Sequence, residues 1–210
     1  MEVKRYDLLN HLIDTYGFVN YLEIGIWAGE CIKNVKAEHK HWVDPGIEGN
    51  IDKHLPDECN YRISSDRFFE LLEGEDIKYD LIFIDGLHHS QQVKKDIENS
   101  LKHLQPYGMI MLHDCNPQTY ESQVVPRMSS LWHGDVWKAY VGFKQTHPQF
   151  NCYVVDTDCG CGIIVNNKDH TQIPVDLDLD YKTLEKNRIE LLNLISVDEF
   201  KEIFSWKFYM

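Results

Sequence analysis

Long hydrophobic runs are missing from this sequence. A transmembrane helix needs about 20 consecutive apolar residues, and no stretch of the 210 residues approaches that length. The first five residues, Met1-Glu-Val-Lys-Arg, also lack the apolar segment of a secretory signal peptide. We therefore expect a cytoplasmic protein with no membrane partner.

Positive charge is scarce as well. The chain has 21 lysines and arginines against 34 aspartates and glutamates, so its formal net charge is −13 at pH 7. The basic residues are scattered in ones and twos, whereas binding to a phosphate backbone needs them clustered. No nucleic-acid partner is therefore expected.

Clustered cysteines, which would indicate a zinc site or a disulfide framework, are few. Only Cys159 and Cys161 lie close together among the six cysteines, and one C-x-C pair without a second is a weak metal signal. We interpret the cysteines as structural thiols in a reducing compartment. The composition otherwise is that of a globular protein, and a length of 210 residues predicts a single domain over residues 1–210.

What the sequence does contain is an alternation of apolar strands with helical patterns. The expected strands lie near residues 21–25, 41–44, 61–63, 79–85 and 108–113. Strands that alternate with helices predict an α/β fold with a mostly parallel sheet. An N-terminal helix is expected within residues 1–17, and closing helices within residues 180–210. The alternation of strands and helices is interrupted over residues 115–148. Two further strands, at 150–156 and 161–166, form a predicted hairpin.

Carboxylates follow several of these strands. Glu23, Asp44, Asp85 and Asp114 each lie at or just after the end of an expected strand. Ligands of open α/β sheets bind at the carboxyl ends of the strands. Any one aspartate is explained equally well as a turn residue, but four carboxylates together with a glycine turn indicate a ligand site.

The glycine turn after the first strand is Gly25-Ile26-Trp27-Ala28-Gly29. A dinucleotide-binding loop places a second glycine where this chain has Trp27, because the backbone must approach a pyrophosphate there. The turn therefore disfavours NAD and favours a ligand without a pyrophosphate. Asp44, about twenty residues further on, is placed to accept hydrogen bonds from ribose hydroxyls, or else it is a solvated turn residue.

The most informative segments are Ile84-Asp85-Gly86-Leu87-His88 and the strand from Gly108 that ends in His113-Asp114. Here the sequence resembles the class I methyltransferases that bind S-adenosylmethionine. Within them it is similar to a group with an I-D-G-x-H element after strand four, which includes O-methyltransferases of small molecules and sugars. The resemblance runs from about residue 18 to about residue 166. It implies a Rossmann-like three-layer sandwich with a seven-stranded, mostly parallel sheet whose last strand is antiparallel.

The same resemblance implies which residues bind the cofactor. Glu23 and Gly25 would border the methionine part, Asp44 would hold the ribose, and Ser65 and Asp66 would lie near the adenine. Ser64, Ser65 and Asp66 are explained as well by a cap on the next helix. The expected cofactor-binding residues are Glu23, Gly25, Ile26, Trp27, Gly29, Asp44, Ser65, Asp66 and Asp85.

The resemblance also implies catalytic residues, with His88 as general base beside Asp85 and Asp114. Some relatives bind a divalent metal such as Mg²⁺, for which the ligands here would be Asp85, Asp114 and Asn116. Cys115 follows Asp114 where those relatives have a second ligand, so whether a metal is required stays open.

The predicted function is O-methylation of a small hydroxylated metabolite or sugar. An N-methyltransferase and an inactive cofactor-binding module are the alternatives, and a homodimer is left open. Segment 115–148 is expected to line the acceptor site or to form its lid. His89, Trp132 and Trp137 are the candidate substrate contacts, although Trp137 and its neighbours also have the spacing of a packed helix.

Overall fold

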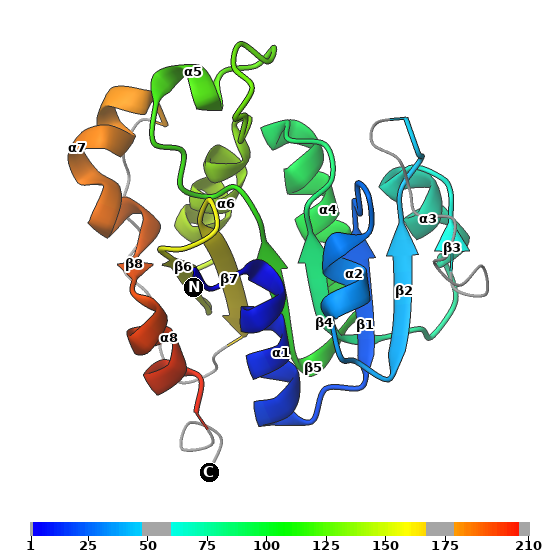
Figure 1. The fold of residues 1–210 in the computed structure, drawn as a ribbon. Helices are drawn as coiled ribbons and strands as arrows, with labels where there is room; N and C mark the ends of the chain where they lie inside the picture. The colour runs from blue at the N-terminus through cyan, green and yellow to red at the C-terminus, as the bar shows by residue number, and fades with distance from the viewer. Residues whose placement is uncertain (1, 48–59, 167–178, 206–210) are drawn as a thin grey trace.

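A computed structural model describes residues 2–47, 60–166 and 179–205 of the chain (Figure 1). Among these residues, eight strands form one sheet in the order β3-β2-β1-β4-β5-β7-β6-β8. The strands are β1 (Asn20–Ile24), β2 (His39–Val43), β3 (Asn60–Tyr61), β4 (Tyr79–Ile84), β5 (Leu104–Leu112), β6 (Phe150–Val155), β7 (Cys161–Asn166) and β8 (Leu194–Ile195).

The direction of the strands confirms the predicted sheet. Strand β7 pairs antiparallel with both β5 and β6, and every other described pair is parallel. The seventh strand is thus the antiparallel one, as predicted. The two-residue strand β8, which was not predicted, extends the sheet beside β6.

Helices cover both faces of the sheet. They are α1 (Arg5–Tyr16), α2 (Glu30–Asn34), α3 (Ser65–Leu71), α4 (Ser90–Lys102), α5 (Tyr120–Gln123), α6 (Val136–Thr146), α7 (Tyr181–Leu192) and α8 (Val197–Ile203). Buried side chains of α3, α4, α6 and α7 share one hydrophobic core, and those of α1, α2 and α8 share another. The sheet lies between these two cores, so the fold is the predicted three-layer sandwich.

Alternation along the strands builds these two cores from one sheet. In β1, Tyr21 faces the core of α1 and α2, whereas Leu22 and Ile24 face the core of α3 and α4. Helix α4 buries Val93 and Ile97, which are four residues apart on one side of the helix.

The predicted start of the fifth strand differs from the structure. Strand β5 begins at Leu104, four residues before the predicted start at Gly108, and it includes Pro106. The register between β4 and β5 shifts between Tyr79 and Leu81, so that Leu104 and Met109 have paired residues in β4 and Pro106 has none. A proline, which cannot donate a backbone hydrogen bond, is tolerated at such an irregular position. Residues 206–210 of the predicted C-terminal helices lie outside the described residues. None of the described helices has the length and apolar character that crossing a membrane requires.

Candidate active site

The centre of the candidate site lies where the strand order reverses. The chain runs outward from β1 to β2 and β3, then returns to place β4 on the other side of β1. Gly25 directly follows β1, and Asp85 directly follows the neighbouring strand β4. The Asp85 N–H donates a hydrogen bond to the Ile24 carbonyl at 2.8 Å, so the two strand ends lie side by side. Gly25 has a positive φ of 82°, and a Cβ there would collide with the Asp85 carbonyl. The approach of the two strand ends therefore requires a glycine.

Asp44 holds the glycine turn in place. Its Oδ2 accepts hydrogen bonds from the N–H groups of Ile26 at 2.9 Å and Trp27 at 3.3 Å, and its Oδ1 accepts one from Gly46 at 2.7 Å. The carboxylate is buried and the Trp27 side chain is 60% exposed. The turn is thus built from predicted cofactor-binding residues, including Gly29, where φ is 85°. The role of Asp44 toward a ribose stays a prediction.

Glu23 lies beneath this turn, buried on the same side of the sheet as Tyr21. The Tyr21 hydroxyl donates to Glu23 Oε2 at 2.6 Å. Burial raises the pKa of Glu23 to about 8, although the hydrogen bond from Tyr21 opposes the shift. The group is therefore neutral in the folded protein over a range of pH in which it would be ionised in the unfolded chain.

A pH-dependent stability is expected from Glu23. Its folded pKa of about 8 lies above the unfolded value near 4.5, so the stability should fall as the pH rises between these two values. The slope due to this group is up to about 1.4 kcal/mol per pH unit. Urea unfolding of the wild type and of Glu23→Gln at pH 5 and pH 8 checks this. Glu23→Gln should lose less stability between the two pH values, and an equal loss in both proteins would contradict the assignment.

The three predicted catalytic residues meet at the ends of β4 and β5. His88 Nε2 lies 3.5 Å from Asp85 Oδ1 and 3.3 Å from Asp114 Oδ2. Asp114 has a positive φ of 60°, which is uncommon for a residue other than glycine and occurs often at functional sites. Burial lowers the pKa of His88, but Asp85 and Asp114 outweigh it, so the pKa is raised above its ordinary value.

The other nitrogen of His88 defines its tautomer. Nδ1 lies 3.2 Å from the Trp132 carbonyl oxygen. Because a carbonyl oxygen only accepts hydrogen bonds, Nδ1 carries the proton and the lone pair of the neutral ring is on Nε2. Nε2 faces the two carboxylates, whose negative charges favour a proton there too and so raise the pKa of the ring. Once that proton has left, Nε2 is the nitrogen that can accept one.

The structure adds Arg5, His113, His133 and Asp158 to this cluster. Arg5 Nη1 lies 3.0 Å from Asp85 Oδ2 and 3.0 Å from His113 Nδ1. His133 is 2% exposed, and its Nε2 is 3.8 Å from Asp114 Oδ1. None of the four is among the predicted site residues. No local motif connects Arg5, His133 or Asp158 to Asp85.

Two overlapping groups of side chains have spacing that suits a metal ion. The first group is Asp85, His88 and Asp114, and the second is His113, Asp114 and Cys159. In each group, one potential ligand atom from every residue lies within 4.8 Å of the corresponding atoms of the other two. The third predicted ligand, Asn116, is oriented differently. Its Nδ2 donates to Asp156 Oδ1 at 2.9 Å. Its Oδ1 accepts from Arg188 Nη1 at 2.5 Å.

The predicted adenine contacts form a group of their own. Gln92 Nε2 donates to Asp66 Oδ1 at 2.9 Å and to Ser65 Oγ at 3.3 Å. The residue that caps α3 is Ser64, whose Oγ accepts from the Arg67 N–H. Ser65 is thus not the capping residue, and its contact with adenine stays a prediction.

The two candidate tryptophans of segment 115–148 have different surroundings. The Trp132 ring stacks on His88 at 5.3 Å between centroids and meets the edge of His89 at 6.0 Å. Gly134 packs so closely on this loop that a Cβ would collide with the His88 carbonyl. Trp137, in contrast, is fully buried in the core, and its indole donates to Gln123. The prediction that Trp137 contacts the substrate is therefore wrong, because the helical spacing of its apolar neighbours turns it inward.

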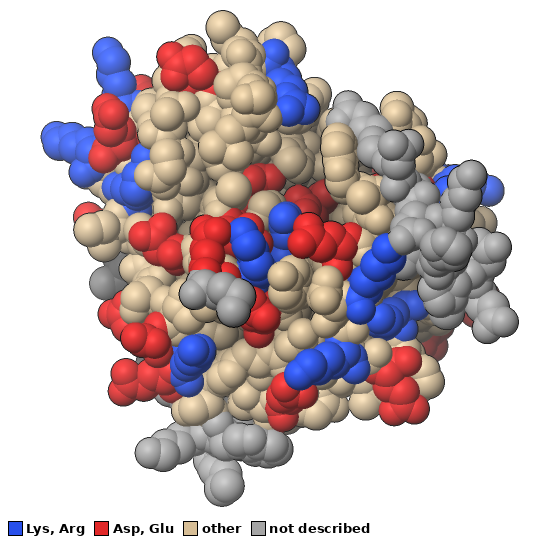
Figure 2. Space-filling view, in the orientation of Figure 1, with Lys and Arg blue, Asp and Glu red and all other residues tan. Residues whose placement is uncertain are grey.

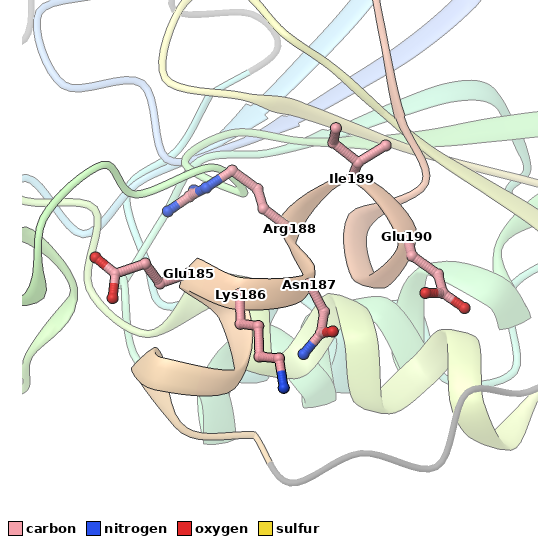
Figure 3. Close-up of a pocket in the computed structure, with 6 residues that line it drawn as sticks. All are labelled: Glu185, Lys186, Asn187, Arg188, Ile189 and Glu190. Carbon is pink, nitrogen blue, oxygen red and sulfur yellow. The ribbon is translucent and has the colours of Figure 1, made fainter.

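A surface pocket of about 440 Å³ lies elsewhere, at a kink of α7 (Figure 3). It is lined by residues 185–190, and Asn187 has a non-helical φ of −120°. No predicted site residue lines it. On the face of the molecule in Figure 2, basic side chains stand in small groups between acidic ones.

Comparison with known proteins gives two findings. Residues 22–115 match a family model described as a methyltransferase domain. Among curated proteins no sequence match was found.

Solved structures with a similar fold include three bacterial proteins. The first, from Staphylococcus aureus and assigned as a caffeoyl-CoA O-methyltransferase, has a TM-score of 0.55 and 21% identity over 79% of this chain and 85% of its own. An assigned O-methyltransferase from Klebsiella pneumoniae has a TM-score of 0.55 and 16% identity, covering 78% and 80%. An O-methyltransferase from Bacillus cereus, solved with SAH, has a TM-score of 0.51 and 16% identity, covering 79% and 83%. At these identities the likeness establishes the fold.

Proposed function

We propose that this chain, which has the class I methyltransferase fold and a methyltransferase domain in residues 22–115, is an S-adenosylmethionine-dependent O-methyltransferase of small molecules. The observation that carries the proposal is the convergence of Asp85, His88 and Asp114 at the switch point of the sheet, beside the Gly25 turn. This convergence supports His88 as a proton acceptor at the edge of the sheet where open α/β folds bind ligands.

S-adenosylmethionine fits the chemistry of the residues around the turn. Trp27 stands where a pyrophosphate would need a glycine, so NAD fits poorly. Asp44 lies next to the glycine turn, where its carboxylate can accept hydrogen bonds from a ribose. Ser65 and Asp66 offer polar atoms to an adenine. When bound, S-adenosylmethionine supplies a methyl group on a positively charged sulfur. The Bacillus cereus relative, solved with SAH, supports the same choice.

The chain's own part in the reaction is to activate the acceptor. His88 Nε2 removes the proton of the acceptor hydroxyl, whose oxygen forms the new bond to the methyl carbon while the carbon–sulfur bond breaks. The Trp132 carbonyl keeps Nδ1 protonated, so that Nε2 is the basic nitrogen. Asp85 and Asp114 stabilise the imidazolium that forms.

The predicted magnesium site fits these residues poorly. Mg²⁺ prefers hard oxygen ligands, but the Asn116 amide is bound to Asp156 and Arg188. The Arg5 guanidinium, moreover, lies 3.0 Å from Asp85 Oδ2. We therefore derive no catalytic step through a metal.

The first test is ligand binding. S-adenosylhomocysteine should raise the melting temperature of the protein, because a ligand that binds only the folded state stabilises it by mass action. NAD at the same concentration should leave the melting temperature unchanged. A thermal shift with NAD and none with S-adenosylhomocysteine would overturn the proposal.

A second test concerns Trp132 as part of the acceptor site. Trp132→Ala removes the ring that stacks on His88, so we expect the acceptor KM to rise several-fold while S-adenosylhomocysteine affinity stays the same. Trp137→Ala is the matched control. Because Trp137 is fully buried, its truncation should destabilise the fold by about 3–5 kcal/mol. If Trp132→Ala lowers the melting temperature as much as Trp137→Ala does, Trp132 is a core residue.

A further inference from the structure

Arg5, the first residue of α1, is held in one orientation by Asp158. Its backbone N–H donates to Asp158 Oδ2 at 2.8 Å, and its side-chain Nε lies 3.3 Å from the same oxygen. The end of the guanidinium then reaches Asp85 Oδ2 and His113 Nδ1, both at 3.0 Å. The arginine thus links the N-terminal helix to the ends of β4 and β5.

The turn that carries Asp158 contacts the start of α1 and has an unusual backbone conformation. Asp158, Cys159 and Gly160, between β6 and β7, all have positive φ, at 43°, 67° and 88°. Two consecutive non-glycine residues in this conformation are costly and persist only where the surroundings hold them. The preceding Thr157 donates its hydroxyl proton to the Val3 carbonyl at 2.6 Å. The turn therefore contacts the residues before α1 as well as Arg5.

The guanidinium occupies one side of the Asp85 carboxylate. Oδ2 is paired with Arg5, while Oδ1 faces His88. An arginine keeps its charge at any physiological pH. A divalent ion bound to Asp85 would therefore stand within a few ångströms of a fixed positive charge, and the repulsion at that separation is large in a partly buried site.

We propose that Arg5 is a positioning residue that supplies the positive charge at the ends of β4 and β5 in place of a divalent metal. It neutralises Asp85 and holds that carboxylate beside His88. The role in catalysis rests on the proposed methyltransferase function, but the exclusion of the metal does not.

Manganese binding by the full chain without cofactor tests the exclusion directly, with free Mn²⁺ measured by electron paramagnetic resonance. Arg5→Met removes the charge and keeps a side chain of similar length, so it should bind Mn²⁺ at least about tenfold more tightly than the wild type. Arg5→Lys keeps the charge and should behave as the wild type. Arg67→Met, which removes an exposed arginine paired with Glu70, is the matched control and should also behave as the wild type.

A second pair of variants identifies the site. Adding Asp85→Asn to Arg5→Met should abolish the gain, because the ion would use the freed carboxylate. Asp158→Asn, which loosens Arg5 without removing it, should give a smaller gain in the same direction and serves if Arg5→Met does not fold. The proposal is overturned if the wild type binds Mn²⁺ as tightly as Arg5→Met, or if the gain survives Asp85→Asn.

Turnover in the presence of EDTA provides an independent readout. The wild type should keep its full rate in the chelator, and a loss that Mg²⁺ restores would overturn the proposal. A protein that binds no S-adenosylhomocysteine but shows the expected Mn²⁺ behaviour would refute the proposed function alone.

Discussion

Replacing His88 by alanine is expected to lower kcat by about 10²–10⁴-fold, the usual cost of losing a general base. The affinity for S-adenosylhomocysteine should change little, since the imidazole faces Asp85 and Asp114 at the acceptor side of the site. Steady-state kinetics together with calorimetric titration of S-adenosylhomocysteine separates the two effects.

His89→Ala is the matched control for this variant. His89 is the adjacent residue and touches only the edge of Trp132 among the site's aromatic rings, so its loss should affect the acceptor KM more than kcat. If His89→Ala lost as much kcat as expected for His88→Ala, and His88→Ala lost none, the base would be misassigned.

Replacing Gly25 by alanine is expected to have the largest effect on cofactor binding. A Cβ at this position would collide with the Asp85 carbonyl, and the φ of 82° is unfavourable for alanine in any surroundings. Relieving the collision requires the ends of β1 and β4 to separate. We expect S-adenosylhomocysteine binding to be lost and the melting temperature to fall.

Gly17→Ala distinguishes the collision from the backbone conformation. Gly17 ends α1 with a similar φ of 67°, but nothing lies within 4 Å of its Cβ position. It should therefore cost only about 1 kcal/mol of stability and leave S-adenosylhomocysteine binding intact. Equal losses of stability and binding in the two variants would show that the contact with Asp85 is unimportant.

The sequence allowed the sheet to be predicted because its signal is local. Strand β4 is apolar through its middle, as a strand buried on both faces must be, and it was expected within two residues of its observed bounds. That Asp85 and Asp114 converge followed from the rule that parallel strands carry their ligands at their carboxyl ends. The place of His88 beside them was implied by the resemblance to methyltransferases with an I-D-G-x-H element. What the structure adds is how close these three side chains lie.

The remaining contacts could not be predicted because they join residues far apart in the chain. Arg5 and Asp85 are 80 positions apart, and Arg5 and Asp158 are 153 apart. Neither pair forms a motif, and the pairing depends on how α1 packs across the sheet. The orientation of Asn116 depends in the same way on Arg188 of α7. A single sequence can predict which helix or strand a residue belongs to. It does not predict which side chain, distant in the chain, that residue contacts in the folded protein.

A crystal structure of the protein with S-adenosylhomocysteine tests the central claim most directly. The account predicts one molecule across the Gly25 turn, with its ribose beside Asp44 and its sulfur facing the acceptor side formed by Asp85 and His88. It also predicts that Arg5 stays on Asp85 when Mg²⁺ is present in the crystal. A cofactor bound away from the Gly25 turn, or its sulfur directed away from His88, would contradict the account.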